Sequence, residues 1–200
     1  EERDHRQDLA GVLAYLLRPP DLRQGKPLGP DQIAWAERVE ELTVTRYAQR
    51  WNEARLAIEA ARSLSKDIPI IATMTLDATP RGYFTVMGTS VEQACAELVA
   101  AGADVVGSNC GNGIEKMLEI AHEFSNHARV PIAIQSNAGL PENRGGVLVY
   151  PETPEFMAAR VTELIDLGVR IIGGCCGTTP AHIEAIADAV SGKPPRRTPS

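Results

Sequence analysis

Residues 173–180 read Gly-Gly-Cys-Cys-Gly-Thr-Thr-Pro, and this stretch decides the fold. The apolar run 169–172 just before it predicts a short buried strand. Thr179 is a residue type that caps helices, and Pro180 is favoured at the first helical position. The two adjacent cysteines therefore lie between the end of a strand and the start of a helix. Parallel α/β folds place their chemistry at such strand ends.

A third cysteine, Cys110, follows another apolar run in the same way, within the sequence Gly-Ser-Asn-Cys-Gly at residues 107–111. Three thiols at the ends of two strands predict a site for a soft metal, and zinc fits such ligands best. Cys110, Cys175 and Cys176 would leave the fourth tetrahedral position open for a substrate thiol, as in catalytic zinc sites. His182 is the nearest candidate for a fourth protein ligand, which would make the site structural instead.

The composition argues against several classes of partner. The chain has 200 residues, with 26 acidic and 20 basic side chains and a net charge of −6, which predicts neither a nucleic-acid surface nor a membrane surface. No apolar run approaches the roughly 20 residues of a membrane span, and the chain opens on charged residues rather than on a secretory signal. The cysteines are therefore expected to be reduced thiols in a cytoplasmic protein. Cys95, among alanines in a predicted helix, is interpreted as a packing residue.

Strand, loop and helix alternate along most of the chain, which predicts a parallel sheet with helices outside it. The pattern gives four βα units between residues 69 and 190, and a weaker unit over 42–65. Ser90 and Gln93 predict a capping box at the start of one helix. The expected strands cover residues 42–45, 70–74, 103–107, 131–135 and 169–172, and residues 75–89 and 139–152 are expected to be long loops.

Two of the helices carry specific expectations. The helix over 52–64 is expected to have one apolar face through Leu56, Ala60 and Leu64. Another is expected to run as one continuous helix over 154–167, since Thr153 can cap it and Gly168 can end it.

The motif at 107–111, followed by the one at 173–180, resembles the homocysteine S-methyltransferase family, and the likeness extends over roughly residues 52–190. The resemblance implies a parallel (β/α) barrel of the TIM type, in which zinc on Cys110, Cys175 and Cys176 activates the thiol of homocysteine. Methyl transfer to that thiol gives methionine.

A complete (β/α)₈ barrel takes on the order of 250 residues, so the expected α/β fold is an incomplete barrel of about four to five βα units, its second half. Residues 1–41 are expected to form an unassigned segment of helix and loop. Residues 42–190 would be the methyltransferase-like domain, and 191–200 a disordered tail.

Four residues are candidates for substrate binding: Asn109, Asn137, Gly174 and Thr178. Asn109 and Asn137 have a simpler interpretation as turn residues, and both interpretations stay open at this point. Free N–H groups at the start of the helix after Thr179 would suit the carboxylate of an amino acid.

The sequence of residues 75–82 resembles family members that work with corrinoid proteins, which favours a methylcorrinoid donor supplied by a partner protein. Betaine, S-methylmethionine and methyl-folate donors also occur among the relatives and stay open. Asp77 and Arg81 in this loop could contact the substrate or the partner, or could be solvated loop residues.

Two departures from the family pattern bear on substrate binding. Residues 1–41 hold no counterpart of the family's Asp-Gly motif, and Arg46 or a neighbour stands where a Glu is usual. The sequence therefore leaves two hypotheses. The first is a zinc-dependent homocysteine methyltransferase. The second is a non-catalytic zinc-binding half-barrel, completed by a second copy in a homodimer or by another chain that supplies the front half.

Overall fold

Four parallel strands form the central sheet of the computed structural model, which describes residues 51–193. The strands are β1 (Ile71–Met74), β4 (Val105–Asn109), β5 (Ile132–Ser136) and β8 (Val169–Gly174), in the order β1-β4-β5-β8. The sheet confirms the four strands predicted after residue 69, with ends shifted by one or two residues. The predicted strand over 42–45, the position of Arg46, the segment 1–41 and most of the tail lie outside the described residues.

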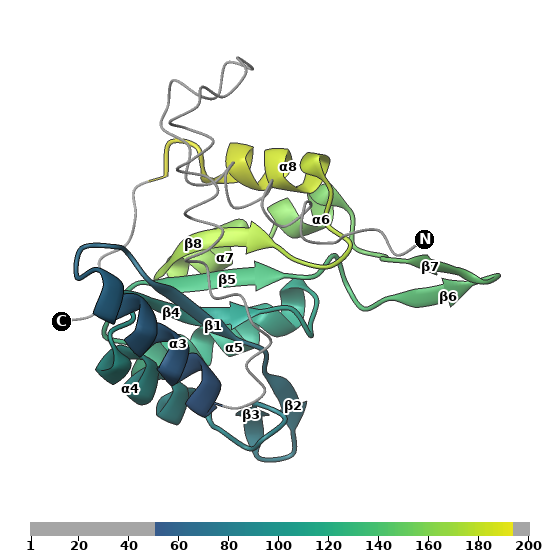
Figure 1. Cartoon of the computed structure of the whole chain (residues 1–200). Helices are drawn as coiled ribbons and strands as arrows, with labels where there is room; N and C mark the ends of the chain where they lie inside the picture. The colour runs from purple at the N-terminus through teal and green to yellow at the C-terminus, as the bar shows by residue number, and fades with distance from the viewer. Residues whose placement is uncertain (1–50, 194–200) are drawn as a thin grey trace.

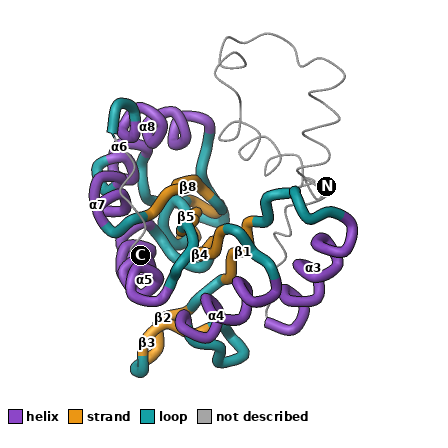
Figure 2. Tube along the Cα trace, turned by 90° about the vertical axis from the view of Figure 1, so that its left-hand side faces the viewer, coloured by secondary structure: helices purple, strands orange, loops and turns teal. Residues whose placement is uncertain are grey.

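Helices cover one side of this sheet, as a view roughly along the strands shows (Figure 2). They are α3 (Trp51–Leu64), α4 (Val91–Ala101), α5 (Ile114–His127), α6 (Pro154–Ala158), α7 (Val161–Asp166) and α8 (Pro180–Val190). Side chains alternate between the faces of a strand, so Ile132 and Ile134 of β5 point into the core beneath the helices. Gln135 points to the other face and is only half-buried.

The start of α4 follows the predicted capping pattern. The side chain of Ser90 accepts a hydrogen bond from the N–H of Gln93, and the Gln93 side chain accepts one from the N–H of Ser90. Gly102 ends the helix in the left-handed conformation, with φ of 113°. Cys95 is 3% exposed within this helix, which confirms its interpretation as a packing residue.

The apolar face predicted for α3 was wrong. Leu56 and Leu64 are 56% and 82% exposed, whereas Ala54, Ile58 and Ala61 are buried in the core. These three residues belong to the hydrophobic core, and α3 packs against α4, so tertiary packing decided which face is buried.

The helix predicted over 154–167 is also wrong in one respect, because it is interrupted between α6 and α7. An unbroken helix would need the N–H of Arg160 to donate to the carbonyl of Phe156. Instead the Arg160 guanidinium donates to that carbonyl at 2.9 Å, and the Arg160 N–H donates to Met157 O at 3.1 Å. The guanidinium also stacks on the Phe156 ring and pairs with Glu115 of α5, which holds it there.

Both regions predicted as long loops contain an antiparallel hairpin. The first pairs β2 (Asp77–Thr79) with β3 (Gly82–Phe84), and the second pairs β6 (Glu142–Arg144) with β7 (Val147–Val149). Both follow the C-terminal ends of sheet strands, and the β6–β7 hairpin projects well away from the body of the domain (Figure 1). The Gly145-Gly146 turn, at positive φ, was the sequence signal for the second hairpin.

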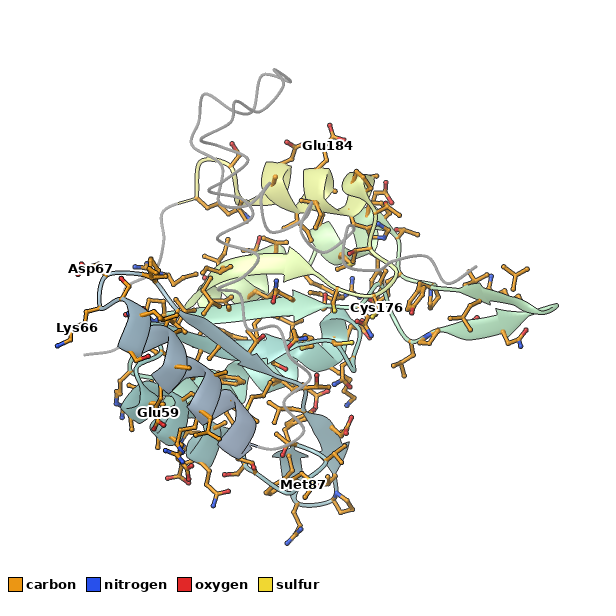
Figure 3. All side chains as sticks on the ribbon, viewed as in Figure 1. Glu59, Lys66, Asp67, Met87, Cys176 and Glu184 are labelled. Atoms are coloured by element: carbon orange, nitrogen blue, oxygen red, sulfur yellow. The ribbon has the colours of Figure 1, made fainter. Side chains whose placement is uncertain are left out.

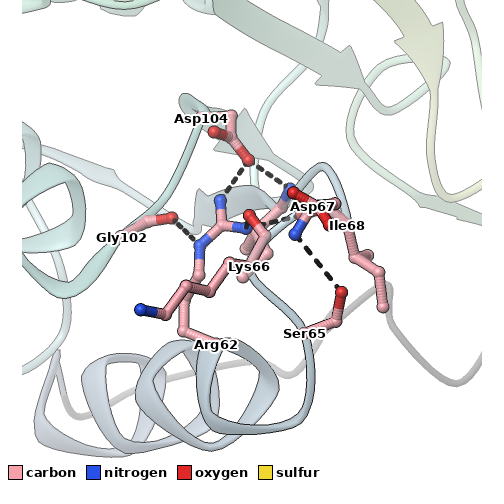
Figure 4. Close-up of polar contacts among 8 residues, drawn as sticks. Arg62, Ser65, Lys66, Asp67, Ile68, Gly102 and Asp104 are labelled. Atoms are coloured by element: carbon pink, nitrogen blue, oxygen red, sulfur yellow. Dashed lines mark hydrogen bonds and ion pairs between the residues drawn. The ribbon is translucent and has the colours of Figure 1, made fainter.

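A polar cluster around Arg62 closes the opposite end of the sheet, where the strands begin (Figure 4). The Arg62 side chain donates to the carbonyls of Gly102 and Ile68, at 2.9 and 2.7 Å, and pairs with Asp104. Asp104 also accepts from the N–H of Ile70 at 2.7 Å. The cluster thus ties α3 to the starts of β1 and β4. None of the helices within 51–193 has the length and apolar character needed to cross a bilayer.

Candidate metal centre

Three cysteines meet at the C-terminal ends of the strands. Cys110 directly follows β4, and Cys175 and Cys176 directly follow β8, two strands away in the sheet. Their sulfur atoms all lie within 4.8 Å of one another, and those of Cys110 and Cys176 are 3.5 Å apart. Cys176 lies close to the base of the β6–β7 hairpin (Figure 3). The structure therefore brings together the residues that the sequence predicted as metal ligands.

The backbone at Cys110 has a strained conformation that helps to bring its sulfur close to the other two. Its φ is 61°, and it is the one non-glycine residue with positive φ in the described part of the chain. Such a conformation costs on the order of 1 kcal/mol and persists only when neighbouring contacts enforce it. Here the Cys110 N–H donates to Gln135 O at 3.0 Å, and Gly111 continues the turn at φ of 74°. The turn reverses the chain directly after β4, so that the sulfur stays at the edge of the sheet.

The end of β5 is the scaffold that holds both cysteine loops. Besides the bond from Cys110 to Gln135, the N–H of Cys175 donates to Ser136 O at 2.7 Å. Asn137 then joins the two loops: its N–H donates to Asn112 O at 3.0 Å, and its side-chain oxygen accepts from the N–H of Cys176 at 3.1 Å. The positions of the sulfurs thus depend on a strand that carries no cysteine.

The three sulfurs fit a tetrahedral zinc ion. Zinc–sulfur bonds of about 2.3 Å place two tetrahedral thiolates about 3.8 Å apart, close to the 3.5 Å between Cys110 and Cys176. The hydrogen bond to the Cys110 thiol, together with burial, raises the pKa of Cys175 well above its ordinary value. A divalent cation would reverse this trend, because its charge favours thiolates over thiols.

His182 does not join the sulfurs as a fourth ligand. Its Nδ1 accepts from the N–H of Thr179 at 3.1 Å, which places the proton on Nε2. Nε2 then donates to Glu152 O at 2.9 Å. Both ring nitrogens are therefore engaged in holding the start of α8, which argues against the structural four-ligand site.

The residues predicted to bind substrate lie around the cysteines with clear structural contacts. Thr178 donates its hydroxyl to Cys175 O at 2.7 Å and so closes the cysteine turn. Gly174 leaves room for that side chain, since a Cβ there would come within 2.5 Å of Thr178 Oγ1. Asn109 is 5% exposed at the end of β4, and its carbonyl accepts from Thr75 Oγ1 at 3.1 Å. Contact of these residues or Asn137 with a substrate stays a prediction.

The loop residues Asp77 and Arg81 separate in the structure. A Cβ added to Gly111 would lie 4.0 Å from Asp77 Oδ1, so this carboxylate is next to the Cys110 turn. The Arg81 guanidinium instead lies over the Phe84 ring, 5.4 Å from its centre, within the hairpin. Of the pair, Asp77 is thus the one placed beside the turn that carries Cys110.

Two residues near the cysteine loops were not predicted from the sequence: Tyr150, which lies against Gly177, and Glu152, which lies at the start of α5. Burial, and then the neighbouring Cys176 thiol, raise the pKa of Tyr150. Burial also raises the pKa of Glu152, whose side chain accepts from the N–H of Ile114 at 3.0 Å. Neither residue belongs to a motif, and both reach the site because the β6–β7 hairpin returns the chain there.

Comparisons with known proteins agree with this geometry. A family model described as homocysteine S-methyltransferase matches residues 33–190. The methionine synthase of Mycobacterium tuberculosis is 36% identical over 127 residues, which are 63% of this chain and 10% of that protein. The methionine synthase of Mycobacterium leprae is 34% identical over 133 residues, 66% of this chain and 11% of that protein. The chain thus spans about a tenth of the length of these curated relatives.

Solved structures of the homocysteine methyltransferase MmuM from Escherichia coli share the fold. The apo form has a TM-score of 0.56 and 20% identity, and the match covers 80% of this chain and 54% of that one. For the metallated form the TM-score is 0.55 and the identity 18%, with 88% of this chain and 57% of that one covered. At such identities the likeness supports the fold alone.

Proposed function

Because the chain belongs to the homocysteine S-methyltransferase family, we propose that it carries the thiol-activating site of a zinc-dependent methyl transfer to homocysteine, which gives methionine. The observation that carries this proposal is the group of three sulfurs, from Cys110, Cys175 and Cys176, within 4.8 Å of one another. Two sequence-distant motifs converge on one point, which a packing role for the cysteines would not require.

In this proposal Cys110, Cys175 and Cys176 hold the zinc ion. When bound, zinc would act as a Lewis acid and favour the thiolate form of a substrate thiol. The thiolate is the nucleophile in methyl transfer. The protein contributes a fixed geometry: the carbonyls of Gln135 and Ser136 hold the two cysteine loops in place. The proposed substrate-binding residues are Asn109, Asn137, Gly174 and Thr178.

The methyl donor that we propose is a methylcorrinoid carried by a partner protein, as the resemblance of residues 75–82 implies. The position of Asp77 supports a role for this loop, because its carboxylate lies next to the Cys110 turn.

We also propose that residues 42–190 correspond to the second half of a TIM-type barrel. Four parallel strands with helices on one side are consistent with half of such a barrel. The match to 54% of the apo MmuM chain supports the same interpretation.

A second candidate function is a non-catalytic zinc-binding half-barrel completed by a second copy of the chain or by another protein. It is favoured by the sheet order, since β1 and β8 each pair with a single strand among the described elements. Exposed strand edges pair readily with other chains. The mass in solution, from sedimentation equilibrium, separates the cases: a dimer supports completion by a second copy, and a stable monomer contradicts it.

The proposed function is tested first by zinc analysis of the purified reduced protein, with and without homocysteine. We expect about one zinc per chain, as for a single three-thiolate site, and a change in its X-ray absorption spectrum when homocysteine adds a sulfur ligand. Zinc that is indifferent to homocysteine would support the non-catalytic half-barrel. Absence of zinc under reducing conditions would overturn both candidates.

Replacement of one ligand sharpens this test. Cys175→Ser is expected to lose both zinc and methyl transfer, because a serine hydroxyl is a poor ligand for zinc beside two thiolates. Cys95→Ala is the matched control, since Cys95 is buried in α4 away from the cluster, and it should keep its zinc. Full zinc stoichiometry in Cys175→Ser would contradict the ligand assignment.

A further inference from the structure

Glu152 lies where the chain returns from the β6–β7 hairpin, and its side chain caps the helix that follows Cys110. The carboxylate accepts a hydrogen bond from the N–H of Ile114, the first residue of α5, at 3.0 Å. The N-cap residue Gly113 has no side chain of its own that could do so. A Cβ at Gly113 would come within 2.1 Å of Glu152 Oε1, so the glycine leaves the space that the carboxylate fills. The cap of α5 thus comes from a residue 38 positions further along the chain.

The backbone of Glu152 is bonded to the loop that carries the other two cysteines. Its N–H donates to Ala138 O at 3.0 Å, and the N–H of Ala138 in turn donates to Cys176 O at 2.9 Å. Its carbonyl accepts from Nε2 of His182, in the first turn of α8, at 2.9 Å. The two halves of one residue therefore contact the elements that follow Cys110 and Cys176.

A carboxylate suits this position because the start of a helix carries a partial positive charge. Glu152 is half-buried and lines a cavity of about 300 Å³ together with Gly139 and Lys116. The Lys116 ammonium is paired with Glu119 of its own helix, at 2.7 Å. Water can enter this cavity in place of a shorter side chain, so substitutions at position 152 should leave the fold intact.

We propose that Glu152 is a positioning residue for the metal centre, whose carboxylate fixes the start of α5 and so holds Cys110 at the distance from Cys176 that one metal ion needs. The proposal deepens the proposed function and rests on it. Its physical reason is preorganisation. The two sulfurs are 3.5 Å apart although 66 positions separate them in the chain. Ligands held together before the metal arrives need not be ordered when it binds, and this saves part of the cost of binding.

The test measures zinc affinity by competition with a chelator, and the thiolate charge-transfer band of the cobalt(II) form, which reports on the geometry of the sulfurs. Glu152→Ala removes the acceptor, whereas the backbone bonds of residue 152 remain. We expect it to lower zinc affinity by about 10-fold, the lower end for loss of a contact outside the ligands, and to shift the cobalt band. Glu152→Gln keeps an oxygen acceptor and loses only the charge, so it should stay within about threefold of the unmodified protein.

A second readout needs no metal. Hydrogen exchange of the Ile114 amide should be faster in metal-free Glu152→Ala than in the unmodified protein, because the amide loses its acceptor. Glu142→Ala is the matched control: it removes a carboxylate that lines the same cavity but pairs with the exposed Arg144. It should change neither the exchange of Ile114, nor the zinc affinity, nor the cobalt band.

Three results would overturn the proposal. The first is Glu152→Ala with the zinc affinity and cobalt band of the unmodified protein. The second is an equal loss of affinity in Glu142→Ala, since removal of any nearby negative charge would then be enough. The third is a loss in Glu152→Ala that Glu152→Gln does not recover, because the hydrogen bond would then not be the link between Glu152 and the sulfurs.

The outcome separates this inference from the proposed function. If the unmodified protein gives no thiolate band with cobalt, the proposed metal site itself fails. If it gives the band and Glu152→Ala is indistinguishable from it, only the role of Glu152 fails. Should circular dichroism show Glu152→Ala to be poorly folded, Gly113→Ala tests the same contact. Gly113 has φ of −76°, which alanine adopts without strain, and the added Cβ displaces the carboxylate. An unchanged cobalt band in Gly113→Ala would then overturn the proposal.

Discussion

Asn137 shows how much of the metal centre depends on single hydrogen bonds. Its two bonds, to Asn112 and to the N–H of Cys176, connect the loop after β4 with the turn after β8. Asn137 is 5% exposed, so water cannot easily replace a lost partner. The ligand set thus depends on a residue that need not touch the metal, in addition to any role with substrate.

Asn137→Ala is therefore expected to lower the free energy of unfolding by about 2 kcal/mol, because the buried N–H of Cys176 loses its acceptor. Urea denaturation of the metal-free protein would measure this cost. Asn126→Ala is the control, since Asn126 is exposed near the end of α5 and should change the free energy by less than about 0.5 kcal/mol. Equal stability of the two variants would argue against the bridging role of Asn137.

At the scale of the elements, the spacing of β4 and β5 affects the metal centre, because Cys110 follows β4 and the end of β5 holds both cysteine loops. Gly107 in the middle of β4 has no room for a side chain, since a Cβ would lie 1.8 Å from Ala133 O and 2.7 Å from its carbonyl carbon. These are backbone atoms of the neighbouring strand, which cannot move aside as a flexible side chain could. Any residue larger than glycine would push the two strands apart.

We expect Gly107→Ala to cost about 3 kcal/mol of stability, at the upper end for overpacking of a core, and to weaken zinc binding because β4 carries Cys110. Gly168→Ala is its control: Gly168 has φ of 88° but nothing within 4 Å of an added Cβ, so only backbone strain of about 1 kcal/mol applies. Thermal denaturation and cobalt titration of both variants would check this. A milder effect at Gly107 than at Gly168 would contradict the packing argument.

In the domain as a whole, the proposed metal ligands and a stabilising polar cluster lie at opposite ends of the sheet. The cysteines follow the C-terminal ends of β4 and β8. The Arg62 cluster joins α3, the end of α4 and the starts of β1 and β4 at the other end (Figure 4). In parallel α/β barrels, functional residues usually lie at the C-terminal ends of the strands and stabilising residues at the N-terminal ends. Changes at Arg62 should therefore affect stability without altering the metal centre.

Arg62→Ala is predicted to lower the free energy of unfolding by about 2 kcal/mol, because several carbonyls and Asp104 lose one shared cationic donor at a partly exposed site. Arg144→Ala, which removes an exposed pair with Glu142, should cost less than about 0.5 kcal/mol. Urea denaturation gives the stabilities, and zinc content per folded chain should stay unchanged in both variants. Loss of zinc in folded Arg62→Ala would mean that the two ends are coupled.

Most of the regular elements could be predicted from the sequence because their signals are local. Apolar runs predicted the four strands of the sheet, and Ser90 and Gln93 predicted the start of α4. The interruption between α6 and α7 could not be predicted, because it depends on the contact of Arg160 with Glu115, 45 residues away in the chain. The buried face of α3 was likewise decided by packing against α4 rather than by its leucines.

The sequence by itself determined the family, the parallel sheet and the identity of the three clustered cysteines. It could do so because a cysteine at the end of a predicted parallel strand must lie at the same edge of the sheet as its counterparts. Only the tertiary structure decided what holds those cysteines: the end of β5, Asn137 as a bridge, and Glu152 at the start of α5. These contacts join segments that are distant in sequence, and no local pattern encodes which distant segments will meet.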